Sequence, residues 1–354
     1  MASSNPFLTR QRVVLVKTEA TEGTDAAPVV GDDFLLCEEA SIGFEVGIVE
    51  RPALKPYWSP LASVTGGYSV TWSITFELKG GGAADADSPA IPDYDPVLRA
   101  CGMKRVIENV PNPISYKYQP ATTVQLVDAA ASQIAPASMT MWLYEGGTSD
   151  QSGGLNGRLW KLRGCHGNLT GTVTAGERFM LTAEGVGFLT TAGALDTNPL
   201  DAEFPTTVTL QDVAPPVGLS LGFDVDGFDY KASTFSFDLG NDVQLRPCLN
   251  RVDGYLGAVI TGRNPTGSTD PELESIDEVA AGEYFNYMMA ATEGALDMTL
   301  TSEAGGVGYR VDVDAPKCQI VSYGRGDRNG VMTADLGLAF REDGGDDELV
   351  IKVY

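Results

Sequence analysis

The stretch Arg158–Leu189, RLWKLRGCHGNLTGTVTAGERFMLTAEGVGFL, predicts two β-strands joined by a glycine-rich segment. A second version, YRVDVDAPKCQIVSYGRGDRNGVMTADLGLAF, spans Tyr309–Phe340. Each has a strand, a single cysteine (Cys165 or Cys318), a turn-rich segment and a final strand. The cysteines lie 153 positions apart (318 − 165), and the threonines of the shared Thr-Ala phrase lie 151 apart (333 − 182). A short loop deletion accounts for the difference, and repetition at a nearly constant offset indicates a duplicated β-domain.

The alternation of residues outside this stretch sets the fold class. Over Val70–Leu78 apolar and polar residues alternate, which predicts a strand with one buried and one solvated face. One short helix is expected in each half. The first is capped by Asp95 and ends at Gly102, and the second runs from about Ser275 to Glu293. The sequence has no alternation of strands with helices. It predicts a mostly β fold of two tandem antiparallel β-sandwich or barrel domains, each with one flanking helix.

The expected division of the chain follows the composition. Residues 1–11 are predicted to form a flexible arm, and residues 12–190 a first β domain. The small and polar segment 191–206 is predicted to be a linker, and residues 207–354 a second β domain. A long loop is expected at Arg51–Ser69, where three prolines would remove hydrogen-bond donors from a strand.

The charge balance narrows the classes of function. There are 24 basic and 48 acidic residues, a formal net charge of −24. Binding to nucleic acid or to an anionic membrane needs clustered lysine and arginine, so neither is expected. The five cysteines are widely spaced and odd in number. They are interpreted as reduced, mostly buried thiols of a protein that folds in the cytosol. The N-terminus is not expected to be a signal peptide.

Three motifs that could carry chemistry are interpreted as structural. His166 follows Cys165 directly, and a turn residue is favoured over a catalytic pair. Asp224-x-Asp226-Gly-x-Asp229 has its glycine at the wrong place for an EF-hand, so a solvated turn is favoured over a calcium site. Gly324–Gly330 is expected to be a hairpin. No catalytic, metal-binding or cofactor-binding residue is predicted, and the chain is not expected to be an enzyme.

Two segments carry a resemblance to a known family. Lys17–Pro28, KTEATEGTDAAP, resembles the opening of bacteriophage tail tube proteins of the long, non-contractile type. Leu159–Thr170 and the strand that ends in Gly187-Phe188 are similar to the G-x-x-G-N segment of that family. The resemblance implies a β-barrel-like unit with a flanking helix. Such units close into rings, and the rings stack into a hollow tube through which the genome leaves the capsid.

The resemblance also implies partners and a location. The usual ring has six single-domain subunits, so a duplicated chain suggests a trimer with pseudo-sixfold symmetry, with a hexamer as the alternative. Other tail proteins are expected partners, DNA would pass without specific binding, and no membrane is involved. Assembly is expected in the host bacterial cytoplasm, and the final location is the virion tail.

The site expected for this function is an acidic lumen, because negative charge repels the duplex. Glu77 and Asp335 are the candidate lumen-facing acids, and an outer or inter-ring position is the alternative for each. The arm 1–11 and the loops 18–33 and 51–69 are candidates for contacts between rings. Two other functions stay open: a β-sandwich binding module that binds a receptor or decorates a capsid, and a carbohydrate-active enzyme.

Overall fold

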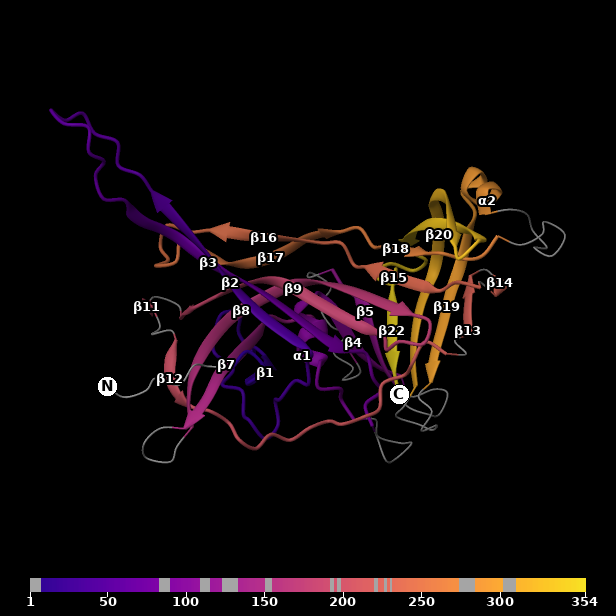
Figure 1. Ribbon diagram of the computed structural model, residues 1–354, viewed down its shortest axis with the longest axis horizontal. Coiled ribbons are helices and arrows are strands. Elements are labelled where there is room, and N and C mark those ends of the chain that lie inside the picture. The colour runs from indigo at the N-terminus through magenta and orange to yellow at the C-terminus, as the bar shows by residue number, and fades with distance from the viewer. Residues whose placement is uncertain are drawn as a thin grey trace.

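The regular secondary structure of the computed structural model is almost entirely β-strand (Figure 1). It describes residues 8–82, 90–108, 115–122, 133–149, 155–191, 194–195, 199–219, 222–225, 228–229, 231–273, 284–301 and 310–354. Residues 1–7 of the predicted arm lie outside the described part. Within the described residues there are two short helices, α1 (Asp95–Ala100) and α2 (Tyr284–Ala290). Neither helix is long and apolar enough to cross a membrane.

The strands are numbered in chain order. Those up to residue 203 are β1 (Arg12–Thr18), β2 (Glu39–Val49), β3 (Val64–Glu77), β4 (Met103–Glu108), β5 (Ser115–Pro120), β6 (Gln133–Ile134), β7 (Met139–Ser149), β8 (Leu155–Thr174), β9 (Met180–Phe188), β10 (Thr190–Thr191), β11 (Ala194–Leu195) and β12 (Leu200–Glu203). The later ones are β13 (Gly222–Val225), β14 (Phe228–Asp229), β15 (Thr234–Asp238), β16 (Asn241–Pro247), β17 (Tyr255–Arg263), β18 (Thr266–Thr269), β19 (Glu293–Thr301), β20 (Arg310–Arg328), β21 (Val331–Arg341) and β22 (Val350–Val353).

The same order of antiparallel pairings occurs twice along the chain. In the first half β1 pairs with β7, β2 with β3, β3 with β9, β7 with β8, and β8 with β9. In the second half β13 pairs with β19, β15 with β18, β18 with β21, β19 with β20, and β20 with β21. Helix α1 follows β3, and α2 follows β18. The two stretches identified in the sequence are the hairpins β8–β9 and β20–β21, and each long strand has a register shift.

Pairings also join the two halves. β8 pairs with β15, which gives the strand order β2-β3-β9-β8-β15-β18-β21-β20, and β5 pairs with β22. β12, inside the segment predicted as a linker, pairs with β8. A continuous cluster of buried side chains runs through both halves. The domain boundaries expected from the sequence stay a prediction. The pairings of β8 with β15, of β5 with β22 and of β12 with β8 cross the expected boundaries.

The buried stripe predicted at Val70–Leu78 is confirmed. Its alternate residues are at most 2% exposed: Val70, Trp72, Ile74, Phe76 and Leu78. On the same buried face, Gly171 leaves room for the Phe237 ring, because a Cβ at Gly171 would lie 2.3 Å from that ring. Burial of apolar area on this face contributes about 25 cal/mol per Å² removed from water.

Helix α1 departs from the prediction at its start. Asp95 lies inside the helix, and its carboxylate does not cap it. The carboxylate instead accepts the Tyr118 hydroxyl at 2.8 Å and pairs with Arg105 at 2.9 Å. The competing reason is charge, since a buried carboxylate is most stable beside a buried cation. Gly102 follows the helix at φ +81°, as expected for a residue after a helix end.

Helix α2 ends earlier than predicted. Its last residue is Ala290, because Ala291 takes φ 51° and the chain enters β19 at Glu293. Residues 275–283 of the predicted helix lie outside the described part. Tyr284, Tyr287 and Met288 pack against the core, as the predicted stripe requires.

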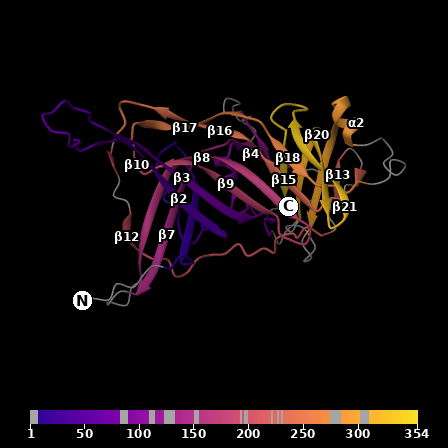
Figure 2. The same ribbon diagram turned by 45° about the horizontal axis from the view of Figure 1, so that its top comes forward.

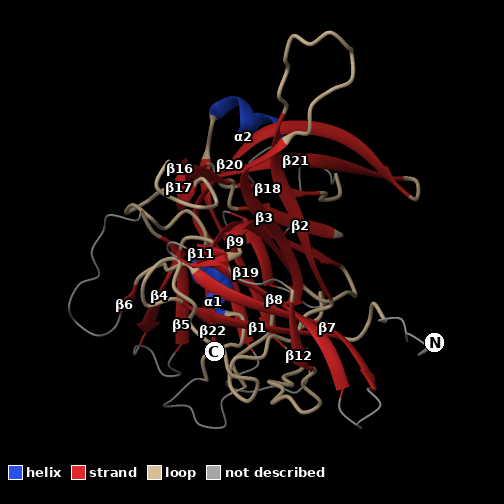
Figure 3. Cartoon of the chain, turned by 90° about the vertical axis from the view of Figure 1, so that its left-hand side faces the viewer, coloured by secondary structure: helices blue, strands red, loops and turns tan. Residues whose placement is uncertain are grey.

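The β2–β3 hairpin extends far beyond the sheet. It projects from one end of the long axis, beside β16 and β17, and α2 lies at the other end (Figures 1 and 2). In the view onto the end from which the hairpin projects, the connection between β2 and β3 stands clear of the other elements (Figure 3). The loop predicted at Arg51–Ser69 is shorter than expected. β3 begins at Val64, which pairs with Val49, because the last of the three prolines is Pro60.

Candidate functional site

A polar face runs across all eight strands of the order β2-β3-β9-β8-β15-β18-β21-β20. Residues directly opposite each other in antiparallel strands point to the same side of a sheet. One row across this face contains Glu39, Thr75, Thr182, Thr170, Asp238, Thr266, Ala339 and Gln319. The next row contains Glu77, Met180, Thr172, Ser236, Ser268, Gly337 and Ser322. Neither row contains lysine or arginine.

Hydroxyl and amide groups hydrogen-bond between strands of this face. The Thr75 and Thr182 hydroxyl oxygens lie 3.1 Å apart, and those of Ser236 and Ser268 2.7 Å apart. The Asn168 amide donates to the Asp238 carboxylate at 2.7 Å. These four hydroxyls therefore partner one another in two pairs, and the charged side chains on the two rows are carboxylates.

Glu77 lies at the rim of this face. Its carboxylate pairs with Arg178, which also pairs with Glu38. The hydrogen bonds that Arg178 donates to these two carboxylates raise its pKa, although the arginine is exposed. Exposed pairs of this kind contribute little to stability. Glu77 is therefore an acid whose charge is partly offset by a neighbouring cation.

Asp335 lies on the same side of the sheet and is exposed. It stands opposite Gly324 and two positions from Gly337 of the second row. A Cβ at Gly326 would lie 2.8 Å from an Asp335 carboxylate oxygen, so the glycine leaves room for the acid. At the far rim Lys317 and Arg341 stand opposite each other. Lys317 contacts Glu293 and Asp343, and Arg341 donates to Gln319.

The opening motif proves to be a buried anchor. Glu19 is 6% exposed, and its carboxylate accepts the Gly23 and Gly164 N–H groups at 2.7 and 2.9 Å. It also accepts the hydroxyls of Ser138 and Thr140 at 2.7 and 2.9 Å. The first part of loop 18–33 is thus fastened to the segment before β7 and to β8.

Asp25 and Lys17 fasten the rest of the same loop. The Asp25 carboxylate accepts the Trp142 indole N–H at 3.1 Å and lies 3.6 Å from the Lys161 ammonium. Lys17 pairs with Asp33 at 2.9 Å. Glu19 and Asp25 therefore position the loop, a role that sequence reasoning missed because most of their partners lie more than 100 positions away.

The residues that could suggest chemistry have structural surroundings. His166 lies in strand β8 and not in a turn, because the register shift after Arg163 lets the strand continue. Burial lowers the pKa of its imidazole, which favours the neutral form. Burial raises the pKa of the Cys37 and Cys318 thiols to about 12, so they stay protonated. The described residues contain no disulfide and no cluster of three or more potential metal ligands.

The other two motifs differ in how much of them is described. Asn329 and Gly330 have positive φ between the paired residues Arg328 and Val331, so the predicted hairpin is confirmed. Asp224 and Asp229 pair across β13 and β14, and residues 226–227 between them lie outside the described part.

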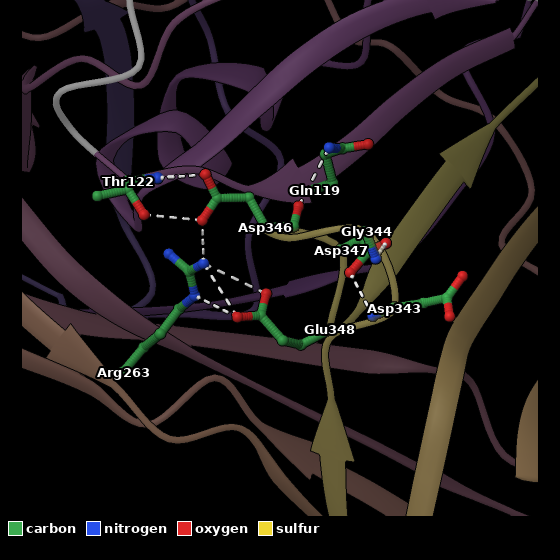
Figure 4. Close-up of polar contacts among 8 residues, drawn as sticks. All are labelled: Gln119, Thr122, Arg263, Asp343, Gly344, Asp346, Asp347 and Glu348. Atoms are coloured by element: carbon green, nitrogen blue, oxygen red, sulfur yellow. Dashed lines mark hydrogen bonds and ion pairs between the residues drawn. The ribbon is translucent and has the colours of Figure 1, made fainter. Parts of the chain in front are cut away.

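The acidic turn before β22 contacts two distant segments, the end of β17 and the end of β5 (Figure 4). The Arg263 guanidinium at the end of β17 contacts the carboxylates of Asp346 and Glu348. Asp346 also accepts the Thr122 N–H at 3.0 Å and its hydroxyl at 2.8 Å, and its carbonyl accepts the Gln119 amide at 3.1 Å. Burial alone would raise the pKa of Asp346, but the Thr122 and Arg263 hydrogen bonds outweigh it and lower the pKa.

The sequence model of the phage tail tube protein family matches residues 9–339. The chain belongs to the phage tail tube protein family. A search of curated proteins found no match. Membership makes the chain a structural component of a bacteriophage tail, and tail tube proteins assemble with other proteins of that tail.

Proposed function

We propose that copies of this tail tube protein close into rings, and that the rings stack into a hollow tube that conducts the viral genome. The supporting observation is the polar face that crosses eight strands and both halves. The two rows described above carry carboxylates and no lysine or arginine, and the cations beside them, Arg178, Lys317 and Arg341, have acceptors within the chain. Along these rows a duplex meets only negative charge and is repelled, so it slides. Glu77 and Asp335 face this lumen in the proposal.

Ring closure uses the two ends of the eight-strand order. Among the described strands, β2 pairs with β3 alone, and Ser322–Arg328 of β20 pair with β21 alone. Exposed edges are templates for pairing with another chain. In the proposed ring, the β20 edge of one copy pairs with β2 of the next copy, in the same way that β8 pairs with β15 within the chain. Because the pairing order occurs twice per chain, three copies form a pseudo-sixfold ring.

Electron microscopy of the purified full-length protein tests the assembly. We expect closed rings of constant bore that stack into tubes, with threefold symmetry and six similar lobes. Discrete unstacked particles would contradict the proposal and favour a receptor-binding or capsid-decorating module. Rings of six full chains would still support the proposed tube but would contradict the proposed ring of three chains.

A charge reversal tests which face lines the bore. Asp335→Lys should make assembled tubes retain duplex DNA at low salt, with retention falling steeply as salt rises. Asp212→Lys, at an exposed acid outside this sheet, is the matched control and should retain none. Equal retention by both variants would show that Asp335 does not face the lumen.

A further inference from the structure

The β16–β17 hairpin covers one specific surface of the first half. The Asn241 amide donates to the Cys101 carbonyl at 2.7 Å, at the end of α1, and the Asn241 N–H donates to the Asn168 side chain of β8 at 2.9 Å. The Ile260 side chain packs closely against Gly102. A Cβ built on Gly102 would lie 2.9 Å from the Ile260 Cδ1 atom. The covered surface is therefore the end of a helix together with the long strand beside it.

This hairpin is the counterpart of the projecting part of β2–β3. β16 and β17 lie between β15 and β18 in the chain, and those two strands repeat the pairing of β2 with β3. We call residues 44–64, which project from β2 and β3, the tongue. Its exposed large apolar residues are Phe44, Val46, Ile48, Val49, Leu54, Tyr57, Trp58, Leu61 and Val64.

The second half has the matching surface, and nothing in the described chain covers it. In α1 the side chains of Val97 and Leu98 are fully buried, whereas α2 has no buried residue. Phe285 and Met289 of α2 are 42% and 69% exposed, and Val321 of β20 is 50% exposed. We call these three residues the α2–β20 patch.

Charge sets the tongue and the patch apart from the rest of the chain. The tongue carries Glu45, Glu50, Arg51 and Lys55, a net charge of zero, and α2 carries no charged residue, in a chain of net charge −24. Two neutral apolar surfaces can approach each other without the repulsion that the rest of the surface would produce.

The tongue and the patch lie at opposite ends of one chain, so a second copy must join them (Figures 1 and 2). We propose that the tongue of one copy docks on the α2–β20 patch of its neighbour, and so repeats between chains the contact that β16–β17 makes within one. This contact is heterologous and can close a ring. The inference rests on the proposed ring, in which β2 of the same copy pairs with the neighbour's β20.

Photo-crosslinking locates the docking surface directly. The variant Trp58→p-benzoylphenylalanine is produced as isotopically light and as heavy chains. The two are mixed, assembled and irradiated, and the cross-linked residues are mapped by mass spectrometry. We expect adducts between different chains at residues 284–291 or 321–323. A probe at exposed Leu210 is the control and should not label α2. Adducts from position 58 that map to any other surface overturn the inference.

A double-mutant cycle tests the same contact energetically. Trp58→Ser and Met289→Ser should each raise the critical concentration for assembly tenfold or more, and the double variant should be little worse than either single one. Leu210→Ser should not change it. Circular dichroism should stay native, since all three side chains are exposed. Fully additive effects overturn the inference.

The two experiments also separate this inference from the proposed function. If rings form but the cross-linked adducts lie elsewhere, only the docking surface is wrong. A wild-type chain that forms no rings refutes the proposed function too.

Discussion

The two halves of this tail tube protein have the same order of strand pairings, but their helices have opposite surroundings. Helix α1 lies in the core, and the chain's own β16–β17 hairpin covers its end. Helix α2 has no fully buried residue: Tyr284, Tyr287 and Met288 are partly buried against the core, and Phe285 and Met289 are exposed. One copy of the repeated surface is covered within the chain. In the docking proposed above, a neighbouring chain covers the other.

The largest effect should come from truncation in the buried helix. Leu98→Ala should destabilise the protein by about 2–5 kcal/mol, because it leaves a cavity at a fully buried position. Met289→Ala in α2 should stay within about 0.5 kcal/mol, because that side chain is largely exposed. Urea unfolding of the unassembled chain measures both. Equal losses would mean that the two helices do not differ as described.

The next effect concerns the buried anchor of the first half. Glu19→Ala should cost about 2–3 kcal/mol, because it leaves the Gly23 and Gly164 N–H groups without their acceptor in a buried place. Glu22→Ala, at an exposed position in the same loop, is the control and should change little. Thermal unfolding followed by circular dichroism compares the two variants. A Glu19 variant as stable as the control would show that loop 18–33 is not held by this carboxylate.

The contact between Arg263 and the acidic turn should depend on pH. The folded-state pKa of Asp346 is lowered, so its contribution is present above the unfolded value of about 4 and is lost as the pH falls through the folded value. Arg263→Met should therefore cost about 1–3 kcal/mol at pH 7 and progressively less toward pH 3. Urea midpoints at several pH values measure this gap. A gap that stays constant with pH would exclude Asp346 as the responsible group.

The smallest effect should be equal in the two halves. Gly176 and Gly330 occupy the ends of the two equivalent hairpins, at φ +82° and +90°, with open space where a Cβ would stand. Substitution of either by alanine should cost about 1 kcal/mol, because only the left-handed backbone is strained. Thermal unfolding of the two single variants provides the comparison. A clear difference between them would show that the hairpins are less alike than their pairings.

Local patterns predicted much of the fold, but not the function of each residue. The alternation at Val70–Leu78 identified a buried face correctly, and the Asn329-Gly330 turn was predictable from its residue types. Asp95 was wrongly predicted to be a cap, because its partner Arg105 lies beyond the helix and Tyr118 in a different strand. Only part of the polar face was predictable. The sequence identified Glu77 and Asp335 as outward-facing acids of two separate strands, but it did not show that these strands belong to one sheet.

The sequence by itself determined the strand content, the duplicated hairpin and the excess of acid, because alternation, repetition and charge are properties of neighbouring or equivalent residues. The tertiary structure alone decided that β8 takes β15, that Glu19 is buried beneath loop 18–33, and that α2 stays uncovered while α1 does not. Each of these depends on contacts between segments tens to hundreds of positions apart, and such contacts leave no periodic pattern in the chain.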